Sequence, residues 1–185
     1  MTTREELRTI ALAEFAAAGY GATSLQRIAE LAGVSKSSVL YHFASKEHLL
    51  EAAIGPAIDR MQLVLAPLEG GPGLGNRQAF LEAFVDFLLE YRLEVNMFIN
   101  QGPSLVDVPV IERANDLVRQ LAEFFAVNSD SLTERMRFGI ALGGAAYMLC
   151  SVQTFDLVQV ETIDETRVAL VAIMSDLLAP AHTLG

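Results

Sequence analysis

The sequence predicts an all-α protein in which an N-terminal three-helix unit is followed by a larger antiparallel helical bundle. Three observations carry this prediction. Apolar residues recur at the 3.6-residue spacing of amphipathic helices over most of the 185 residues. Ser and Thr stand where several of these periodic segments begin, and Gly stands where the first one ends. A hydrophobic content of 52% fits a chain with a large buried core and excludes a disordered one.

Four helices are expected in the N-terminal third of the chain. Gly19 provides a C-terminal stop for the first of them. Thr23 and Gln26 fit a capping box at the start of the second, with Thr23 as the N-cap. Ser35 and Ser45 are suitable N-caps for the third and the fourth. The expected ranges are about 7–18, 23–32, 35–42 and 46–66.

The rest of the chain is also expected to be helical. Residues 66–76, APLEGGPGLGN, have the composition of a linker. Residues 101–109 contain two prolines and are expected to form a loop or a short helix, although residues 105–108 alternate like a strand. The expected helices are about 77–100, 110–126, 131–154 and 162–178.

The charge is distributed unevenly along the chain. Residues 1–48 carry five basic and five acidic side chains, so the whole net charge of −10 lies in residues 49–185. A polyanion can therefore approach only the N-terminal part, because the remainder would repel it. We accordingly expect two domains, 1–48 and 49–185.

Composition also points to the compartment. The single cysteine, Cys150, excludes an intramolecular disulfide and a Cys-based zinc site. The charged opening of the chain indicates that there is no signal peptide. The longest apolar run, 138–150, is shorter than the roughly 18–20 residues that span a bilayer, so we expect a buried helix. A cytoplasmic protein without membrane contact is predicted.

The most specific pattern lies in residues 19–50, GYGATSLQRIAELAGVSKSSVLYHFASKEHLL. It is typical of a helix, a tight turn and a second helix, in which Gly33 permits the turn and Val34 fills the space between the helices. The second helix of such a motif enters the DNA major groove with its N-terminal residues leading. Here that helix opens on Ser35-Lys36-Ser37-Ser38, short donors and one cation suited to phosphate oxygens and base edges.

This stretch resembles the DNA-binding domain of the TetR (tetracycline-repressor-like) transcriptional regulators over about residues 7–50. The resemblance departs at Ser37 and Ser38, where the family often has Gly and Thr, at Leu40, where it often has tyrosine, and at Ala44, where it often has proline. The matching residues are Ala11 through Phe15, Gly19-Tyr20, Ala22-Thr23-Ser24, Ile28-Ala29, Ala32-Gly33-Val34-Ser35-Lys36, Tyr41-His42-Phe43 and Ser45-Lys46-Glu47.

The resemblance implies two groups of DNA contacts. Leu40 removes one phenol that usually contacts phosphate, and Tyr41 is its expected substitute. The residues alone leave a plainer alternative, in which Ser35 and Ser45 are only caps and Tyr41 and Phe43 are core. The implied phosphate contacts are Thr23 or Ser24, Tyr41, His42 and Lys46, and the implied base or mixed contacts are Gln26, Ser35, Lys36, Ser37 and Ser38.

The C-terminal part is rich in aromatic and methionine side chains, which can leave an apolar cavity between helices. In families of this kind an inducer occupies such a cavity, whereas the alternative for each residue is ordinary core. A mostly apolar ligand would be oriented by polar groups at Asn96, Asn100, Gln101 and Gln153, and Arg92 would hold an anionic end. The candidate lining residues are Phe84, Phe87, Leu88, Tyr91, Phe98, Phe124, Tyr147 and Met148.

A dimer interface is expected on the last two helices. The first of them carries small residues that allow a partner helix to approach closely, and the second is apolar nearly all round and so must be covered on both sides. The alternative is that both are central helices of one subunit. The candidate interface residues are Gly139, Gly143, Tyr147, Leu170, Ile173, Met174 and Leu177.

Catalysis has little support. His42, His48 and His182 lack the spacing of metal ligands, and Ser104 lacks the second glycine of a nucleophile elbow. We therefore predict a homodimeric, ligand-responsive transcriptional regulator without cofactor, metal or enzymatic activity. It is expected to be a repressor that a small, largely apolar effector releases from a palindromic operator on double-stranded DNA. The alternatives are a helical carrier of hydrophobic molecules without DNA function, and an enzyme that uses the cavity.

Overall fold

The computed structural model describes residues 3–70, 74–150 and 162–179. Every regular element in these segments is a helix, which confirms the all-α prediction. By packing, the chain divides into two compact units. Unit 1 comprises Met1–Arg60 and Leu93–Asp116, and unit 2 comprises Met61–Arg92 and Leu117–Gly185. The functional boundary expected after residue 48 remains a prediction, since these units are defined by packing alone.

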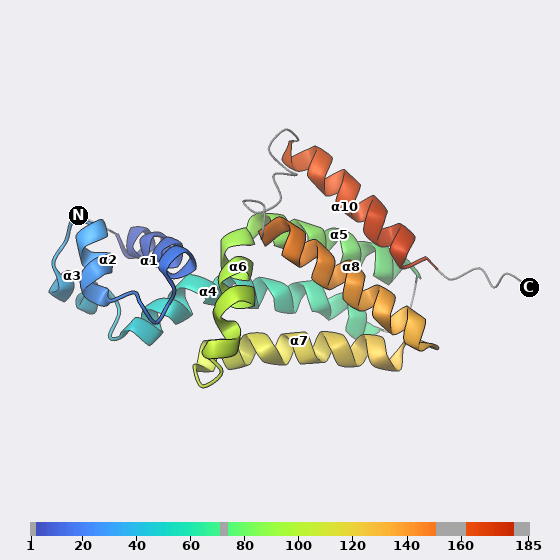
Figure 1. Cartoon of the computed structure of the whole chain (residues 1–185), viewed down its shortest axis with the longest axis horizontal. Coiled ribbons are helices and arrows are strands. Elements are labelled where there is room, and N and C mark those ends of the chain that lie inside the picture. The colour runs from blue at the N-terminus through green and yellow to red at the C-terminus, as the bar shows by residue number, and fades with distance from the viewer. Residues whose placement is uncertain (1–2, 71–73, 151–161, 180–185) are drawn as a thin grey trace, which may run out of the picture. The chain divides into compact units, whose positions relative to one another are not determined.

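Unit 1 begins with three short helices and the start of a long one (Figure 1). Their buried faces supply its core, in which Phe15, Ile28, Val39 and Leu49 are fully buried. Phe43 is also buried, as one of the alternatives for this residue required, and Val34 is half-buried. The helices are α1 (Arg4–Ala18), α2 (Leu25–Leu31), α3 (Lys36–His42) and α4 (Lys46–Leu65).

Unit 1 also contains α6 (Arg92–Gln101) from Leu93 onward, the 3-10 turn η2 (Gly102–Ser104) and the first part of α7 (Pro109–Val127). Arg113 on α7 joins two carboxylates of α4, with Nη1 2.7 Å from Glu51 Oε1 and Nη2 2.8 Å from Asp59 Oδ1. These pairs are exposed, so they align α7 with α4 more than they stabilise the fold.

Unit 2 contains η1 (Ala66–Gly70), α5 (Leu74–Glu90), α8 (Leu132–Cys150) and α10 (Ile163–Leu177). Helices α5, α8 and α10 pack side by side (Figure 1). Aromatic rings fill the space between α5, α7 and α8, and the rings of Phe125 and Phe138 stack with centroids 3.9 Å apart. Arg167 on α10 forms two hydrogen bonds to Asp86 on α5, and this bidentate pair joins α10 to α5.

Three local predictions were wrong. The helix expected over 77–100 is interrupted at Tyr91, where neither Gly nor Pro stands. The break coincides with contacts to the end of α8, since Arg92 donates to the Leu149 carbonyl at 3.5 Å and accepts from the Cys150 thiol at 3.6 Å. The linker expected over 66–76 is helical on both sides of residues 71–73, in η1 and in the first turn of α5.

The third error concerns the start of α2. The N-cap is Ser24, whose hydroxyl accepts the Arg27 N–H at 3.1 Å. Thr23 is unavailable for this role because its hydroxyl donates to the Gly19 carbonyl at 2.8 Å. Elsewhere the ranges agree closely, with residues 105–108 outside any regular element, and the end of the helix expected to residue 154 lies outside the described residues.

Candidate nucleic-acid interface

The turn between α2 and α3 lets these two helices pack against each other. Gly33 adopts φ +65°, a left-handed conformation that side chains disfavour. The Gly33 N–H donates to Glu30 O at 3.1 Å, and the Val34 N–H donates to Ala29 O at 2.9 Å. Ala29 is fully buried, which permits the close approach that a helix-turn-helix requires.

The start of α3 is organised by three serine hydroxyls. Ser35 is the N-cap, and its Oγ accepts the Ser38 N–H at 3.1 Å. The same oxygen lies 3.0 Å from Ser37 Oγ and 2.8 Å from Ser38 Oγ. Ser35 is thus an N-cap, as the sequence predicts, and its side chain is at the same time exposed beside two further hydroxyls.

The outer face of α3 is available for a contact. Val39 is fully buried, whereas Lys36, Ser37 and Tyr41 are exposed. Tyr41 is 86% exposed, which excludes the alternative that it belongs to the core. The half-buried His42 lies edge-on to the Tyr41 ring at 5.2 Å. This face presents hydroxyl, ammonium, phenol and imidazole groups at one helix, a set that suits phosphate and base edges.

Leu40 is the apolar member of this face and was not among the predicted contacts. Its side chain is 41% exposed, next to Tyr41. The signal for it in the sequence was the departure from the usual tyrosine at this position. Because an aliphatic side chain cannot donate to phosphate, any role that Leu40 plays in DNA contact is apolar.

Thr23 and Ser24, the two alternative phosphate contacts at the start of α2, differ in their exposure. Thr23 is 2% exposed and its hydroxyl is engaged with the Gly19 carbonyl, whereas Ser24 is exposed. Of the two, only Ser24 presents a side chain to the surface. Gln26 is exposed too, and its amide donates to Glu30 Oε1 at 3.0 Å.

Lys46 turns toward the protein. Its Nζ donates to the Tyr20 carbonyl at 2.8 Å and to the Thr23 carbonyl at 3.0 Å, and it lies 4.1 Å from the centre of the Tyr20 ring. Burial, with a smaller contribution from the charge of Glu47, raises the pKa of the Tyr20 phenol. The face of this ring is offered to the ammonium group of Lys46.

The residues predicted to line an apolar cavity have different surroundings. Phe84, Phe87 and Leu88 are buried on α5, and the Phe87 ring stacks on Tyr91 with centroids 5.5 Å apart. Phe98 and Phe124 are half-buried, while Tyr147 and Met148 are 50% and 40% exposed. The rings of Phe84, Phe87 and Tyr91 contact one another along α5, and the role of this set as a ligand site remains a prediction.

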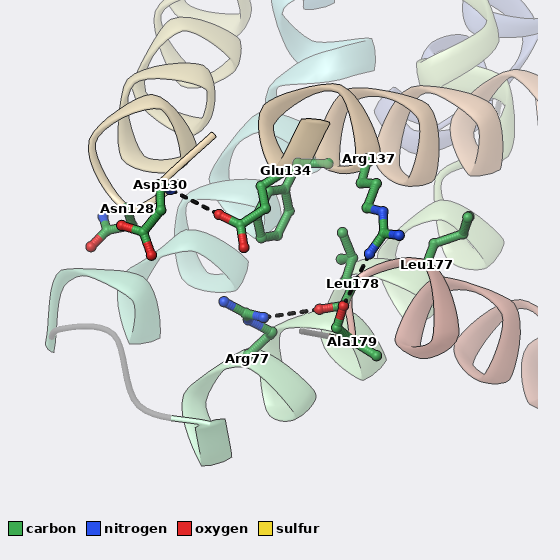
Figure 2. A pocket seen from close by; sticks show the side chains of 9 residues that line it. Arg77, Asn128, Asp130, Glu134, Arg137, Leu177, Leu178 and Ala179 are labelled. Atoms are coloured by element: carbon green, nitrogen blue, oxygen red, sulfur yellow. Dashed lines mark hydrogen bonds between the residues drawn. The ribbon is translucent and has the colours of Figure 1, made fainter. Parts of the chain in front are cut away.

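Unit 2 contains a small pocket of about 130 Å³ at the end of α10, apart from the predicted lining (Figure 2). Arg77 donates to the Leu178 carbonyl at 3.0 Å, and Arg137 donates to the Ala179 carbonyl at 3.3 Å. These guanidinium groups satisfy carbonyls that the helix end leaves without partners. The residues that line this pocket are Arg77, Asn128, Asp130, Glu134, Arg137, Phe138, Leu177, Leu178 and Ala179.

The polar groups expected to orient a ligand make contacts within the protein. Arg92 binds the Leu149 carbonyl, and Asn100 donates to Asn96 O at 2.9 Å within α6. Gln101 contacts Phe15 on α1 and Tyr20 in the turn that follows α1. Gln153 lies outside the described residues.

The predicted dimer face is partly exposed. On α8, Gly139, Gly143 and Tyr147 lie on the surface, and on α10 Ile173 is 56% exposed. Met174 is buried inside the subunit, because α10 is apolar nearly all round and one of its sides packs within the subunit. Leu170 and Leu177 are half-buried.

No three His, Cys, Asp or Glu side chains within residues 3–70, 74–150 and 162–179 lie close enough to hold a metal ion. None of the described helices combines the length and the apolar character needed to cross a membrane. Burial raises the pKa of the Cys150 thiol to about 11, so this side chain is a poor nucleophile.

Comparison with known proteins identifies the class. Residues 8–53, which contain α2, α3 and the turn between them, match the family described as "Bacterial regulatory proteins, tetR family". These residues thus match the TetR family, as the resemblance over residues 7–50 implied.

Curated relatives and solved structures agree with this family. The HTH-type transcriptional regulator RutR of Escherichia coli is 42% identical over 123 residues, 64% of this chain and 52% of RutR. The HTH-type transcriptional repressor KstR2 of Mycolicibacterium smegmatis is 32% identical over 115 residues, 57% of this chain and 53% of KstR2. The chain thus spans about half the length of the curated relatives that it matches.

Solved structures share the fold at low identity. The ketosteroid transcriptional regulator KstR2 of Mycobacterium tuberculosis superposes with a TM-score of 0.68 at 20% identity, covering 92% of each chain. A TetR-family transcriptional regulator from Bordetella parapertussis gives a TM-score of 0.71 at 18% identity, covering 94% of each chain. At these identities the likeness concerns the fold alone.

Proposed function

We propose that the protein is a DNA-binding transcriptional regulator whose helix α3 enters the major groove. The observation that carries this proposal is the exposed N-terminal face of α3, where a capped helix start presents Lys36 beside three hydroxyls. The partial positive charge of a helix start and its unpaired N–H groups favour phosphate. The proposed contacts are Ser24, Gln26, Ser35, Lys36, Ser37, Ser38, Tyr41 and His42.

The protein acts as a homodimer in this proposal, through α8 and α10. Support comes from exposed apolar residues on both helices, among them Ile140 at 60%, Val168 at 66% and Ile173 at 56%. A two-fold axis between subunits would place two α3 helices on a palindromic site, with centres one DNA turn, roughly 34–36 Å, apart. The compartment follows from the partner, since bacterial DNA lies in the cytoplasm.

The direction of control is repression, relieved by a small and largely apolar effector. The relative named as a repressor supports the direction, and the aromatic interior of unit 2 supports an apolar effector. An effector shifts the population between two forms only as far as it binds one of them better. A carrier of hydrophobic molecules without DNA function is the alternative class.

Binding to DNA as a function of salt tests the proposal. Genomic fragments retained by the purified protein supply the duplex, and its affinity is measured by gel shift at several salt concentrations. We expect Lys36→Ala to weaken binding and to flatten the slope of log affinity against log salt by about 0.9 for each phosphate that is no longer neutralised. Arg119→Ala, an exposed cation of α7, is the matched control and leaves the slope unchanged. A wild-type protein that retains no duplex at low salt would refute the proposal and favour the carrier.

A further inference from the structure

The turn that joins α1 to α2, residues 19–23, is held by two side chains from outside these helices. Gln101 is the last residue of α6, and Lys46 is the first residue of α4. They stand 81 and 26 positions from Tyr20 in the sequence, and both bind the main chain of Tyr20. All of these residues belong to unit 1.

The side-chain amide of Gln101 forms two hydrogen bonds to the main chain at and just after the end of α1. Its Nε2 donates to the Phe15 carbonyl at 2.5 Å, and its Oε1 accepts the Tyr20 N–H at 2.6 Å. The Phe15 carbonyl also accepts the Gly19 N–H at 3.1 Å, so both of its lone pairs are used. Only a side chain with one donor and one acceptor can satisfy this pair of main-chain groups.

The position of Gln101 is itself fixed. Helix α6 ends at this residue because Gly102 and Pro103 follow, and the Ser104 hydroxyl donates to the Gln101 carbonyl at 2.8 Å. Gly102 is buried against the Phe98 ring, where an added Cβ would lie 3.3 Å from a ring atom. The side chain of Gln101 is therefore presented to α1 by a rigid end of α6.

Lys46 holds the same turn from the other helix. Its Nζ donates to the carbonyls of Tyr20 and Thr23, and the ammonium group lies over the Tyr20 ring. The Tyr20 peptide thus donates to Gln101 with its N–H and accepts from Lys46 with its carbonyl. Because Thr23 directly precedes the N-cap Ser24, these contacts determine where α2 starts.

We propose that Gln101 and Lys46 are positioning residues of the DNA-binding surface, which place the start of α2 through the main chain of Tyr20 without touching DNA. This inference rests on the proposed function. It assigns Lys46 a role different from the phosphate contact that the family resemblance implied. A shift of the C-terminal end of α6 or of the N-terminal end of α4 would therefore either move the turn 19–23 or break these hydrogen bonds.

The test compares affinity with salt dependence for Gln101→Met and Lys46→Met, on the duplex that the wild-type protein selects. We expect each variant to bind roughly five- to tenfold more weakly, the effect of removing one or two hydrogen bonds. The slope of log affinity against log salt should stay at the wild-type value, because every phosphate contact is retained. Asn100→Met is the matched control, since the hydrogen bond of the exposed Asn100 amide lies within α6, and it should bind as wild type does.

Each remaining outcome has a defined meaning. Unchanged affinity of Gln101→Met would overturn its positioning role, and a slope flattened by about 0.9 per subunit in Lys46→Met would make Lys46 a phosphate contact instead. Gln101→Glu, which keeps the acceptor for the Tyr20 N–H but turns an oxygen toward the Phe15 carbonyl, replaces Gln101→Met if that variant does not fold and should also bind more weakly. A wild-type protein that binds no duplex refutes the proposed function, whereas normal wild-type binding with unaffected variants refutes this inference alone.

Discussion

Ser35 and Ser38 are joined by two hydrogen bonds at the start of α3. The Ser35 Oγ accepts the Ser38 N–H at 3.1 Å, and the two hydroxyl oxygens lie 2.8 Å apart. This reciprocity gives a seven-residue helix a defined first turn. Short helices are marginal by themselves, so the cap and the buried Val39 together decide whether α3 forms.

The first prediction concerns this cap. Ser35→Ala removes the acceptor for the Ser38 N–H and should lower the free energy of unfolding by about 1 kcal/mol. Ser37→Ala is the control, because the hydrogen bond found for its hydroxyl is to Ser35 and not to the main chain. Urea denaturation followed by circular dichroism measures both. Equal decreases for the two variants would contradict the assignment of Ser35 as the cap.

The elements around this cap could be predicted because their signals are local. Ser35 three positions before Ser38, Gly33 in the turn and buried positions at helical spacing all act within a few residues of one another. The same local logic failed at Thr23, whose hydroxyl is taken by the Gly19 carbonyl of the preceding turn. A neighbouring serine then became the cap.

Contacts between distant segments could not be predicted. The interruption at Tyr91 has no local marker, and it coincides with the binding of Arg92 to the end of α8, more than fifty positions away. The type of Gln101 predicts a polar group facing a ligand, but its amide binds an acceptor on α1, the Phe15 carbonyl, and a donor in the following turn, the Tyr20 N–H. A side chain's type shows what it can bind, but only the fold shows which partner it meets.

The second prediction concerns base recognition by Leu40. An exposed aliphatic side chain on the proposed DNA-binding face of α3 is suited to the C5 methyl group of thymine. Replacing the contacted thymine by uracil should weaken wild-type binding by about fourfold per half-site, the effect of about one buried methyl group. In Leu40→Ala that penalty should disappear.

Leu93 provides the control for this measurement. It lies on α6 and has the same exposed fraction as Leu40, 41%. Leu93→Ala should therefore keep the full difference between thymine and uracil duplexes. If no uracil substitution in the selected site affects wild-type binding, Leu40 does not read thymine.

The third prediction follows from the Cys150 thiol. Its pKa is raised to about 11, chiefly by burial and against the opposing effect of Arg92. At pH 8 alkylation by iodoacetamide should be roughly two-hundredfold slower in the folded protein than in urea, where the pKa returns to about 8.5. Similar rates in the two states would contradict the burial of this thiol.

The same shift has a consequence for stability. A thiol whose pKa is higher in the folded state keeps its proton there while the unfolded chain loses it. The unfolded state therefore binds fewer protons between the two pKa values, and stability falls as pH rises from about 8.5 toward 11. Cys150→Ser should show a smaller decrease over this range in thermal denaturation.

The fourth prediction concerns the surface of α8. Met136, Ile140 and Tyr147 are 58%, 60% and 50% exposed at positions that recur on one side of the helix. Gly139 and Gly143 lie among them, and a Cβ added at either would meet no atom within 4 Å. A partner helix could approach this side closely, so it suits a second copy of the chain.

A charge on this surface should separate the subunits. Ile140→Glu would bury a carboxylate without a partner, which costs far more than the contact that it replaces. Sedimentation should then give the 20.1 kDa mass of one chain, whereas the wild-type protein should have twice that mass. DNA affinity should fall as well, because two half-sites would no longer be bound together. Leu63→Glu, at an apolar residue of α4 that is 65% exposed, should leave the dimer intact. A monomeric wild-type protein, or a dimeric Ile140→Glu variant, would rule out this interface.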